Sequence, residues 1–281
     1  MPDVILESGL TLHYIEAGPR DAEQTVLFAH GLFRCSKEFL PMMTRLGALG
    51  FYCIAPDLRG QGRSCRQPVT PIKVEDFGED LGGLLDMLSC GPVHVVGSSI
   101  GGMAALVLAL ERPDLVRSLT LVATRASPWG WRYGEYSLRA VPWMLSSGSC
   151  GRWVVVRNTP RLISRSAKPS RKAVADLLLR RLDWDASGLA QAARGVLAWP
   201  GVLDRLSSIH VPTLVMYGRD DIVTGRREAE KISGKIAGAQ LYCVDCAAHI
   251  PAMEQVDSVL AQLERFLGVE ADEEPGLNPV R

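Results

Sequence analysis

Short apolar runs rich in β-branched residues recur along the chain and are separated by longer segments of mixed polarity. Such runs, bounded by Gly, Pro, Asp or Ser, are typical of strands buried in a sheet. The first two are expected to pair as an antiparallel hairpin at one edge. The pattern predicts eight strands, at residues 5–7, 11–16, 25–29, 52–56, 93–97, 119–123, 213–217 and 240–244.

Between these runs, apolar residues recur every three or four positions, a spacing typical of amphipathic helices. Strands that alternate with helices favour a parallel sheet covered by helices on both faces. We therefore expect an α/β protein with a mostly parallel, eight-stranded, doubly wound sheet. The predicted helices span residues 38–47, 74–88, 101–111, 228–236 and 258–266.

The alternation breaks between residues 126 and 208. We expect this stretch to form a helical cap that is inserted into a core domain made of residues 1–125 and 209–268. The last segment, residues 269–281, is acidic and then rich in Pro and Gly. That composition predicts a disordered tail.

A Gly-x-Ser-x-Gly sequence joins one strand to the apolar helix that follows it, with Gly97, Ser99 and Gly101 as its fixed positions. Such a turn holds its central residue in a strained conformation, and the glycines let the strand and the helix pack closely. The Ser99 hydroxyl then lies next to the amino end of a helix, which favours negative charge. Because the motif alone is common, an ordinary strand-to-helix loop is the alternative.

The strand at residues 25–29 ends in His30–Gly31 and supports the functional interpretation. A serine that attacks a carbonyl creates a negatively charged oxygen, which two preorganised N–H groups must bind. One would belong to Ile100, directly after the serine, and the other to Leu32 in this second loop, with Phe33 as the neighbouring candidate. We expect His30 to hold the loop in place rather than to act as a base.

Two later strands end in an acid and a histidine. The base that serves a serine needs a buried carboxylate to orient it. Asp221 is the first choice and the adjacent Asp220 the alternative, and a solvated turn is the other interpretation of the pair. His249 combines a loop position with the chain order serine, acid, histidine. The remaining histidines are predicted to be structural, at His13, His30, His94 and His210.

These four segments and a fifth, Asp-Leu-Arg-Gly-Gln-Gly-Arg-Ser at residues 57–64, resemble the α/β-hydrolase superfamily from about Val4 to Leu267. The resemblance implies the α/β-hydrolase fold and an esterase-like or lactonase-like member with a helical cap. It implies a structural role for the fifth segment. It also implies catalytic roles for five residues: Ser99 as nucleophile, Asp221 as acid, His249 as base, and Leu32 and Ile100 as oxyanion-binding amides.

Composition limits the partners and the cellular compartment that we expect for this protein. The formal net charge is zero, so no general attraction to nucleic acid or to anionic membranes is expected. No apolar run reaches the roughly 20 residues of a membrane span, and the first residues lack the pattern of a signal peptide. We therefore expect a cytoplasmic protein. No pattern in the sequence predicts its oligomeric state.

Seven cysteines, an odd number scattered along the chain, favour free thiols over a disulfide framework. Cys243 and Cys246 form a Cys-x-x-Cys pair, but no second pair accompanies it, so a metal site is not expected. The predicted chemistry requires neither a metal nor an organic cofactor.

The predicted cap contains all six tryptophans and carries 13 basic against 5 acidic residues. Large aromatic side chains would dock the cap and line an apolar pocket between cap and core. Phe33, Trp129 and Trp131 are the candidates for substrate binding. The basic excess is typical of a solvated helix face, and the alternative is an arginine that binds a substrate carboxylate.

The predicted reaction is hydrolysis of a small to medium, largely hydrophobic ester, lactone or thioester through an acyl-enzyme on Ser99. Superfamily members with Asp at this position, haloalkane dehalogenases and epoxide hydrolases, are disfavoured. Carbon–carbon bond hydrolases of aromatic-ring breakdown keep the serine and are the enzymatic alternative, although they usually have more glycine where this chain has Leu32–Phe33–Arg34. A small-molecule receptor with residual hydrolysis is the alternative from another class.

Overall fold

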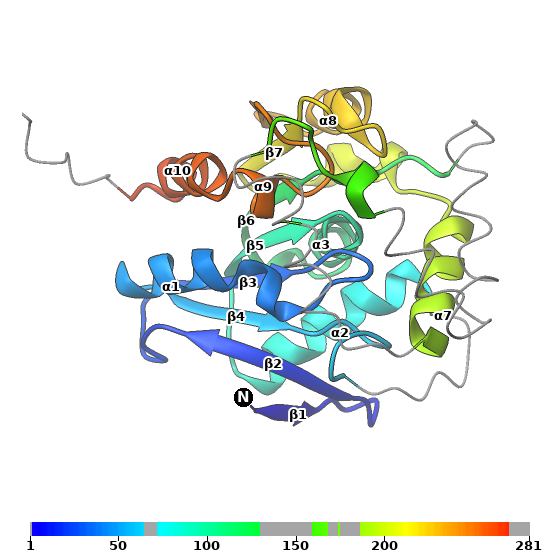
Figure 1. Ribbon diagram of the computed structural model, residues 1–281. Coiled ribbons are helices and arrows are strands. Elements are labelled where there is room, and N and C mark those ends of the chain that lie inside the picture. Colours follow the sequence, from blue (N-terminus) through cyan, green and yellow to red (C-terminus); the bar gives the residue numbers. More distant parts are fainter. Residues whose placement is uncertain (1, 65–71, 130–158, 168–173, 175–185, 270–281) are drawn as a thin grey trace, which may run out of the picture.

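A computed structural model describes residues 2–64, 72–129, 159–167, 174 and 186–269. In these residues eight strands form one sheet with the order β1-β2-β4-β3-β5-β6-β7-β8 (Figure 1). β1 is antiparallel to β2 and β2 to β4, and all other neighbours are parallel. The strands are β1 (Asp3–Ile5), β2 (Thr11–Ala17), β3 (Thr25–Ala29), β4 (Tyr52–Pro56), β5 (Val93–Ser98), β6 (Val116–Val122), β7 (Thr213–Gly218) and β8 (Gln240–Val244).

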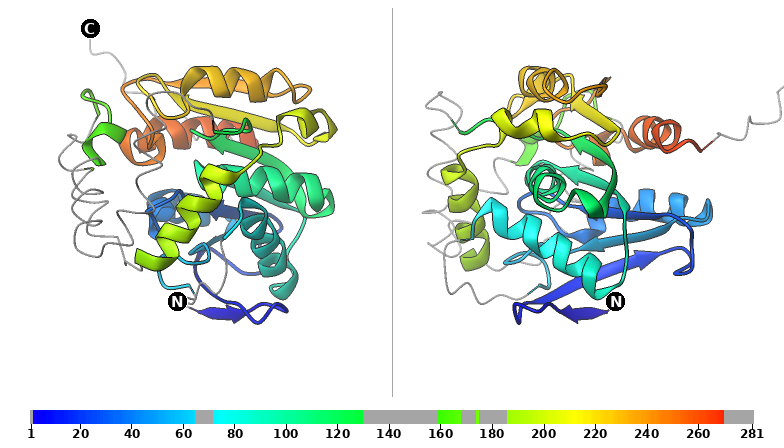
Figure 2. Two further views of the ribbon diagram at one scale, coloured as in Figure 1. Left: turned by 90° about the vertical axis from the view of Figure 1, so that its right-hand side faces the viewer. Right: turned by 180° about the vertical axis from the view of Figure 1, so that it is seen from behind.

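Helices cover both faces of this sheet, as the alternating pattern predicts. α1 (Leu40–Ala48) and α10 (Val256–Leu267) pack on one face around Phe28, Val96 and Met216. α2 (Val74–Met87), α3 (Ile100–Glu111) and α8 (Gly225–Ser233) pack on the other. Figures 1 and 2 show α1 and α10 on one side of the sheet and α2 and α3 on the other. None of the helices in the described ranges is long and apolar enough to span a membrane.

The α/β-hydrolase architecture expected from the sequence is confirmed, and the differences lie at element ends. The first strand is Asp3–Ile5 rather than residues 5–7, because Leu6 N–H donates to Leu10 O and closes the turn there. The helix predicted at residue 38 begins with a 3-10 turn, Ser36–Phe39, before α1. A short helix, α9 (Pro251–Glu254), was not predicted, because four residues carry too little periodicity to reveal it.

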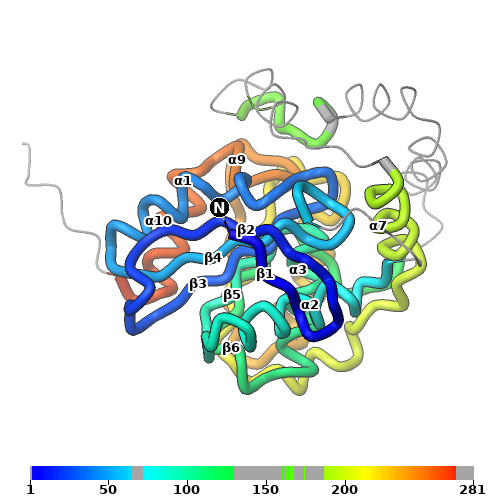
Figure 3. The backbone as a smooth tube through the Cα atoms, turned by 90° about the horizontal axis from the view of Figure 1, so that it is seen from below, coloured from blue at the N-terminus to red at the C-terminus, as the bar shows by residue number. Residues whose placement is uncertain are grey.

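The predicted cap leaves and re-enters the core at one point. Val202 N–H and Leu203 N–H both donate to Ala126 O, at 2.8 and 3.1 Å. Three of its helical segments are described: 3-10 helices at Thr159–Leu162 and Leu203–Ser208, and α7 (Ala186–Ala198), which lies at the margin of the molecule beyond α2 (Figures 1 and 3). Residues 130–158, 168–173 and 175–185 of the predicted cap, and residues 270–281 of the predicted tail, lie outside the described residues.

His94 lies inside β5 and is buried, as a structural histidine should be. Its Nδ1 lies 2.7 Å from Ser118 Oγ and its Nε2 2.9 Å from Gln24 Oε1. Burial and the nearby charge of Arg117 lower the pKa of His94 to about 4. The folded protein therefore binds this proton less readily than the unfolded chain does.

This difference predicts a specific loss of stability in acid. As the pH falls from about 6.5 towards 4, the unfolded chain gains the proton and the folded protein does not, so the free energy of unfolding decreases. Between pH 7 and pH 4.5, urea titrations should show about 2 kcal/mol more loss for the wild type than for His94→Gln. Equal losses in the two proteins would contradict this assignment.

Candidate active site

Ser99 occupies a strained turn between β5 and α3. Its backbone angles are φ 52° and ψ −114°, a conformation that non-glycine residues rarely adopt. Ser99 N–H donates to Val122 O at 2.9 Å, and Ser99 O accepts the Thr124 hydroxyl at 2.6 Å. The first bond runs to the last residue of the neighbouring strand β6 and the second to the segment that directly follows it, and together they hold the strained residue in place.

Glycines on both sides of Ser99 allow the close packing that this turn needs. A Cβ atom at Gly97 would lie 2.4 Å from Gly101 O, and one at Gly101 would lie 2.0 Å from Ala29 O. Both distances are far below van der Waals contact. The Gly-x-Ser-x-Gly pattern is therefore explained by the approach of α3 to β3 and β5.

The three side chains chosen from the sequence meet at the carboxyl ends of their strands. Ser99 Oγ lies 3.0 Å from His249 Nε2, and His249 Nδ1 lies 3.1 Å from Asp221 Oδ2. The Asp221 side chain is fully buried, and that of His249 is 8% exposed. β5, β7 and β8 end at the same edge of the sheet, which is where open α/β sheets bind their ligands.

Asp221 is held in the charged form by its surroundings. Burial by itself raises the pKa of this carboxyl, but the charge and hydrogen bond of His249 and the bonds from Thr224 and Val223 outweigh it and bring the pKa well below its usual value. Oδ1 accepts Val223 N–H at 2.7 Å, and Oδ2 accepts the Thr224 hydroxyl at 2.7 Å and Gly225 N–H at 3.1 Å. A fixed, charged carboxylate can orient a histidine and stabilise its protonated form.

The backbone N–H groups of Leu32 and Ile100, which lie near the serine, have no acceptor within the described part of the chain. Ile100 is the first residue of α3, and the first N–H groups of a helix have no partner inside it. Phe33 N–H, the neighbouring candidate, donates to Gln61 Oε1 at 3.0 Å and is therefore occupied. This geometry leaves Leu32 as the available amide of its loop.

The sequence model of the alpha/beta hydrolase family matches residues 26–262, which is most of the chain. The chain belongs to this family. Two curated relatives match along nearly their whole length. A putative carbamate hydrolase, RutD, of Variovorax paradoxus is 28% identical over 262 residues, which cover 92% of this chain and 96% of the relative. The 3-oxoadipate enol-lactonase 1 of Acinetobacter baylyi is 26% identical over 263 residues, covering 92% and 94%.

Among solved structures, a thermophilic esterase from Thermogutta terrifontis with bound malate superposes with a TM-score of 0.85 and 26% sequence identity. The match covers 95% of this chain and 97% of the esterase. The two proteins therefore share one architecture over nearly the whole of this chain.

The second aspartate of the pair has a different partner. Ser164, in the segment inserted after β6, donates its hydroxyl to Asp220 Oδ2 at 2.5 Å. Asp220 therefore binds the insertion, and it is Asp221 that the fold places against His249. The choice between two adjacent carboxylates depends on contacts that spacing alone does not reveal.

His30 is fully buried and holds loops together, as expected from the sequence. Leu58 N–H donates to its Nε2 at 2.9 Å, and its Nδ1 lies 2.8 Å from Gly31 O. Burial lowers the pKa of His30, so the ring is neutral. With both ring nitrogens bonded to backbone, His30 has no free position at which to accept a proton from substrate.

Glu254 is a residue that the sequence reasoning missed. It is fully buried at the end of α9. Its carboxylate accepts the N–H groups on both sides of His249, Ala248 at 3.0 Å and Ile250 at 2.9 Å, as well as Ser164 N–H at 2.6 Å. Burial raises its pKa, and these backbone hydrogen bonds offset part of the rise. The only signal in the sequence is a glutamate in the apolar segment directly after His249.

Of the three candidates for substrate binding, the structure describes Phe33 and Trp129. Phe33 is half-buried with φ 63°. Trp129 is half-buried beneath the Arg125 guanidinium, which lies 4.0 Å from the ring centroid, and its buried indole N–H has no acceptor among the described residues. Trp131 lies outside the described residues.

Five cysteines of the described part of the chain form no disulfide, and two of them are buried, Cys35 and Cys53. Burial raises the pKa of Cys35, which follows the Leu32 loop, to about 11. The same cause raises the pKa of Cys53 to about 12. Both are therefore protonated and weakly nucleophilic at neutral pH.

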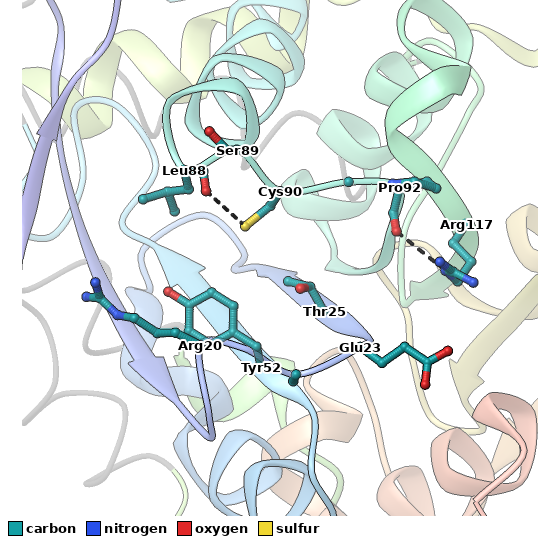
Figure 4. A pocket seen from close by; sticks show the side chains of 11 residues that line it. Arg20, Glu23, Thr25, Tyr52, Leu88, Ser89, Cys90, Pro92 and Arg117 are labelled. Atoms are coloured by element: carbon teal, nitrogen blue, oxygen red, sulfur yellow. Dashed lines mark hydrogen bonds between the residues drawn. The ribbon is translucent and has the colours of Figure 1, made fainter.

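A surface hollow lies at the opposite end of the sheet (Figure 4). Thr25 and Tyr52, which line it, are the first residues of β3 and β4, and Arg117 lies at the start of β6. Ser99, Asp221 and His249 follow the carboxyl ends of their strands. The hollow is therefore separate from the candidate active site.

Glu254→Gln should destabilise the protein and lower its activity. The amide nitrogen of glutamine would face backbone N–H groups that now donate to a carboxylate, so the expected loss in the free energy of unfolding is about 2 kcal/mol. Urea denaturation measures this loss. The control is Glu230→Gln, which breaks an exposed pair with Arg226 and should cost less than about 1 kcal/mol. Equal costs for the two variants would contradict the role of Glu254.

Proposed function

We propose that this protein is a serine hydrolase that cleaves carboxylic esters or lactones through an acyl-enzyme on Ser99. The observation that carries the proposal is the hydrogen-bonded chain from Ser99 Oγ through His249 to Asp221. The available N–H groups of Leu32 and Ile100 support it. Together they supply a nucleophile, a base and two donors for a negatively charged oxygen.

The reaction follows from this arrangement. His249 Nε2 takes the Ser99 proton as Oγ attacks the substrate carbonyl, and Asp221 stabilises the imidazolium that forms. The Leu32 and Ile100 amides bind the oxyanion. His249 then protonates the leaving oxygen, and a water molecule activated by His249 releases the acid from Ser99.

The substrate class is proposed from the relatives together with the site. An enol-lactonase and an esterase act on carbonyl carbons bonded to oxygen, as their names state, and the site geometry suits that chemistry. The half-buried Phe33 and Trp129 favour a small to medium substrate with a hydrophobic part.

Hydrolysis of nitrophenyl esters of increasing acyl length and of simple lactones tests the proposal. Ser99→Ala should lower kcat by at least about 10⁴-fold, because the nucleophile is lost while the fold is kept. A burst of nitrophenol equal to the enzyme concentration would show the acyl-enzyme directly.

Turnover that survives in Ser99→Ala would overturn the proposal. Absence of turnover on every ester and lactone would also count against it. That result would favour a carbon–carbon bond hydrolase or a receptor, for which ligand-induced stabilisation is the next measurement.

Substitutions of the two adjacent aspartates should differ in their effect on kcat. Asp221→Asn should lower kcat by about 10⁴-fold, because the amide favours the wrong histidine tautomer. Asp220→Asn should keep most of kcat. It should lower the free energy of unfolding by about 1 kcal/mol, because its bond to Ser164 is weakened. Steady-state kinetics and urea titration of both variants measure this. The reverse ranking in kcat would assign Asp220 as the acid.

A further inference from the structure

We propose that the buried Arg34–Glu38 ion pair, together with Gln61, positions the two oxyanion-binding amides relative to each other. The inference rests on the proposed function, since it assigns these amides to an oxyanion. None of the three side chains is among the groups that the mechanism uses. They are positioning residues, which act through the backbone of Leu32 and Ile100.

The ion pair holds the loop that carries Leu32. Glu38 Oε2 accepts Gly31 N–H at 3.2 Å, and Glu38 Oε1 accepts Arg34 Nη1 at 2.6 Å. Both side chains are buried, with 6% of Arg34 and 1% of Glu38 exposed. The amide directly before Leu32 is therefore tied to a fixed carboxylate.

The same arginine reaches the turn that carries Ile100. Arg34 Nη1 donates to Ser98 Oγ at 3.2 Å, and Ser98 directly precedes Ser99. Contacts thus run without a break from Gly31 through Glu38 and Arg34 to Ser98, and they connect the two segments whose amides bind the oxyanion. The guanidinium also lies against Gly31, where a Cβ atom would come within 1.6 Å of Nη2.

Gln61 holds the other side of Leu32. This residue is 1% exposed, and its Oε1 accepts Phe33 N–H. Both amides that flank Leu32 are therefore bound to buried side-chain oxygens. The Leu32 N–H between them is left free and fixed in direction, which is what transition-state stabilisation by a preorganised donor requires.

The hydrogen-bonding groups of the Arg34–Glu38 pair indicate that it positions the two donor segments and does not merely stabilise the fold. A buried ion pair often stabilises a protein no more than apolar residues of similar size would. Apolar residues, however, have no acceptor for Gly31 N–H and no donor for Ser98. The ion pair supplies both, at the two segments where the donors lie.

The test is the double variant Arg34→Met/Glu38→Met, which removes both charges at once and leaves neither one unpaired. We expect the variant to fold with a lowered Tm, because Gly31 N–H loses its acceptor. We expect kcat on a nitrophenyl ester to fall by about tenfold to a hundredfold, because misplaced donors lose part of their effect. KM should stay within about threefold, since ground-state binding does not depend on these donors.

A transition-state analogue separates positioning from general damage. An aryl trifluoromethyl ketone adds to Ser99 and places an oxyanion on the two amides. Its affinity should fall by the same factor as kcat in the double variant. Gln61→Met removes a neutral amide whose Nε2 has no partner among the described residues, so this variant is expected to fold. It should shift kcat and analogue affinity in the same direction.

The matched control is Arg45→Met/Glu264→Met. This pair joins α1 to α10 at 2.8 Å and touches neither donor segment. It should leave kcat and analogue affinity unchanged.

Unchanged kcat and analogue affinity in folded Arg34→Met/Glu38→Met or Gln61→Met would overturn this inference while the proposed function stands. An equal fall in kcat in the control variant, Arg45→Met/Glu264→Met, would also overturn it. If the wild type shows no turnover that depends on Ser99, the proposed function fails and the inference fails with it. The Ser99→Ala comparison identifies that case.

Discussion

The architecture of the active-site edge depends on buried carboxylates that accept backbone N–H groups. Loops that leave the carboxyl ends of strands carry amides that the sheet does not pair, and an unpaired buried amide is costly. Four acids supply the acceptors. Asp57 binds the amides of Ser36 and Arg63, Glu38 that of Gly31, Asp221 those that follow it, and Glu254 those around His249. The loops that carry Leu32, Asp221 and His249 are thereby held in place.

This arrangement links the candidate active site to the inserted segment. Glu254 binds Ser164 N–H as well as the histidine loop, and His249 N–H itself donates to Leu162 O at 3.0 Å. Asp220 binds the Ser164 hydroxyl. The backbone around His249 is therefore positioned partly by the segment between β6 and β7, so a change in how that segment packs would move His249. Adjacent aspartates take separate tasks because their side chains point to different partners.

Much of the fold was predictable because the local spacing of apolar residues indicates strands and helices. Buried parallel strands appear as apolar runs, and Gly97 and Gly101 mark a turn that only glycine permits. The segments containing Ser99, Asp221 and His249 were identified for the same reason, and the structure brings these three side chains into contact. Their catalytic roles stay a prediction. The helix α9 and the exact start of α1 were missed, because short helices carry little periodic signal.

The sequence by itself determined the α/β architecture and the strained turn, since each depends on residues close together along the chain. It also determined the chain order of serine, acid and histidine, since each of the three lies in a segment with its own local pattern. Only the tertiary structure decided that Asp221 rather than Asp220 meets His249, and that Leu32 rather than Phe33 keeps a free amide. It also revealed that Arg34, Glu38 and Glu254 are buried. The reason is physical. The sequence does not show whether a charged side chain is solvated by water or by backbone amides, because those amides belong to distant parts of the chain.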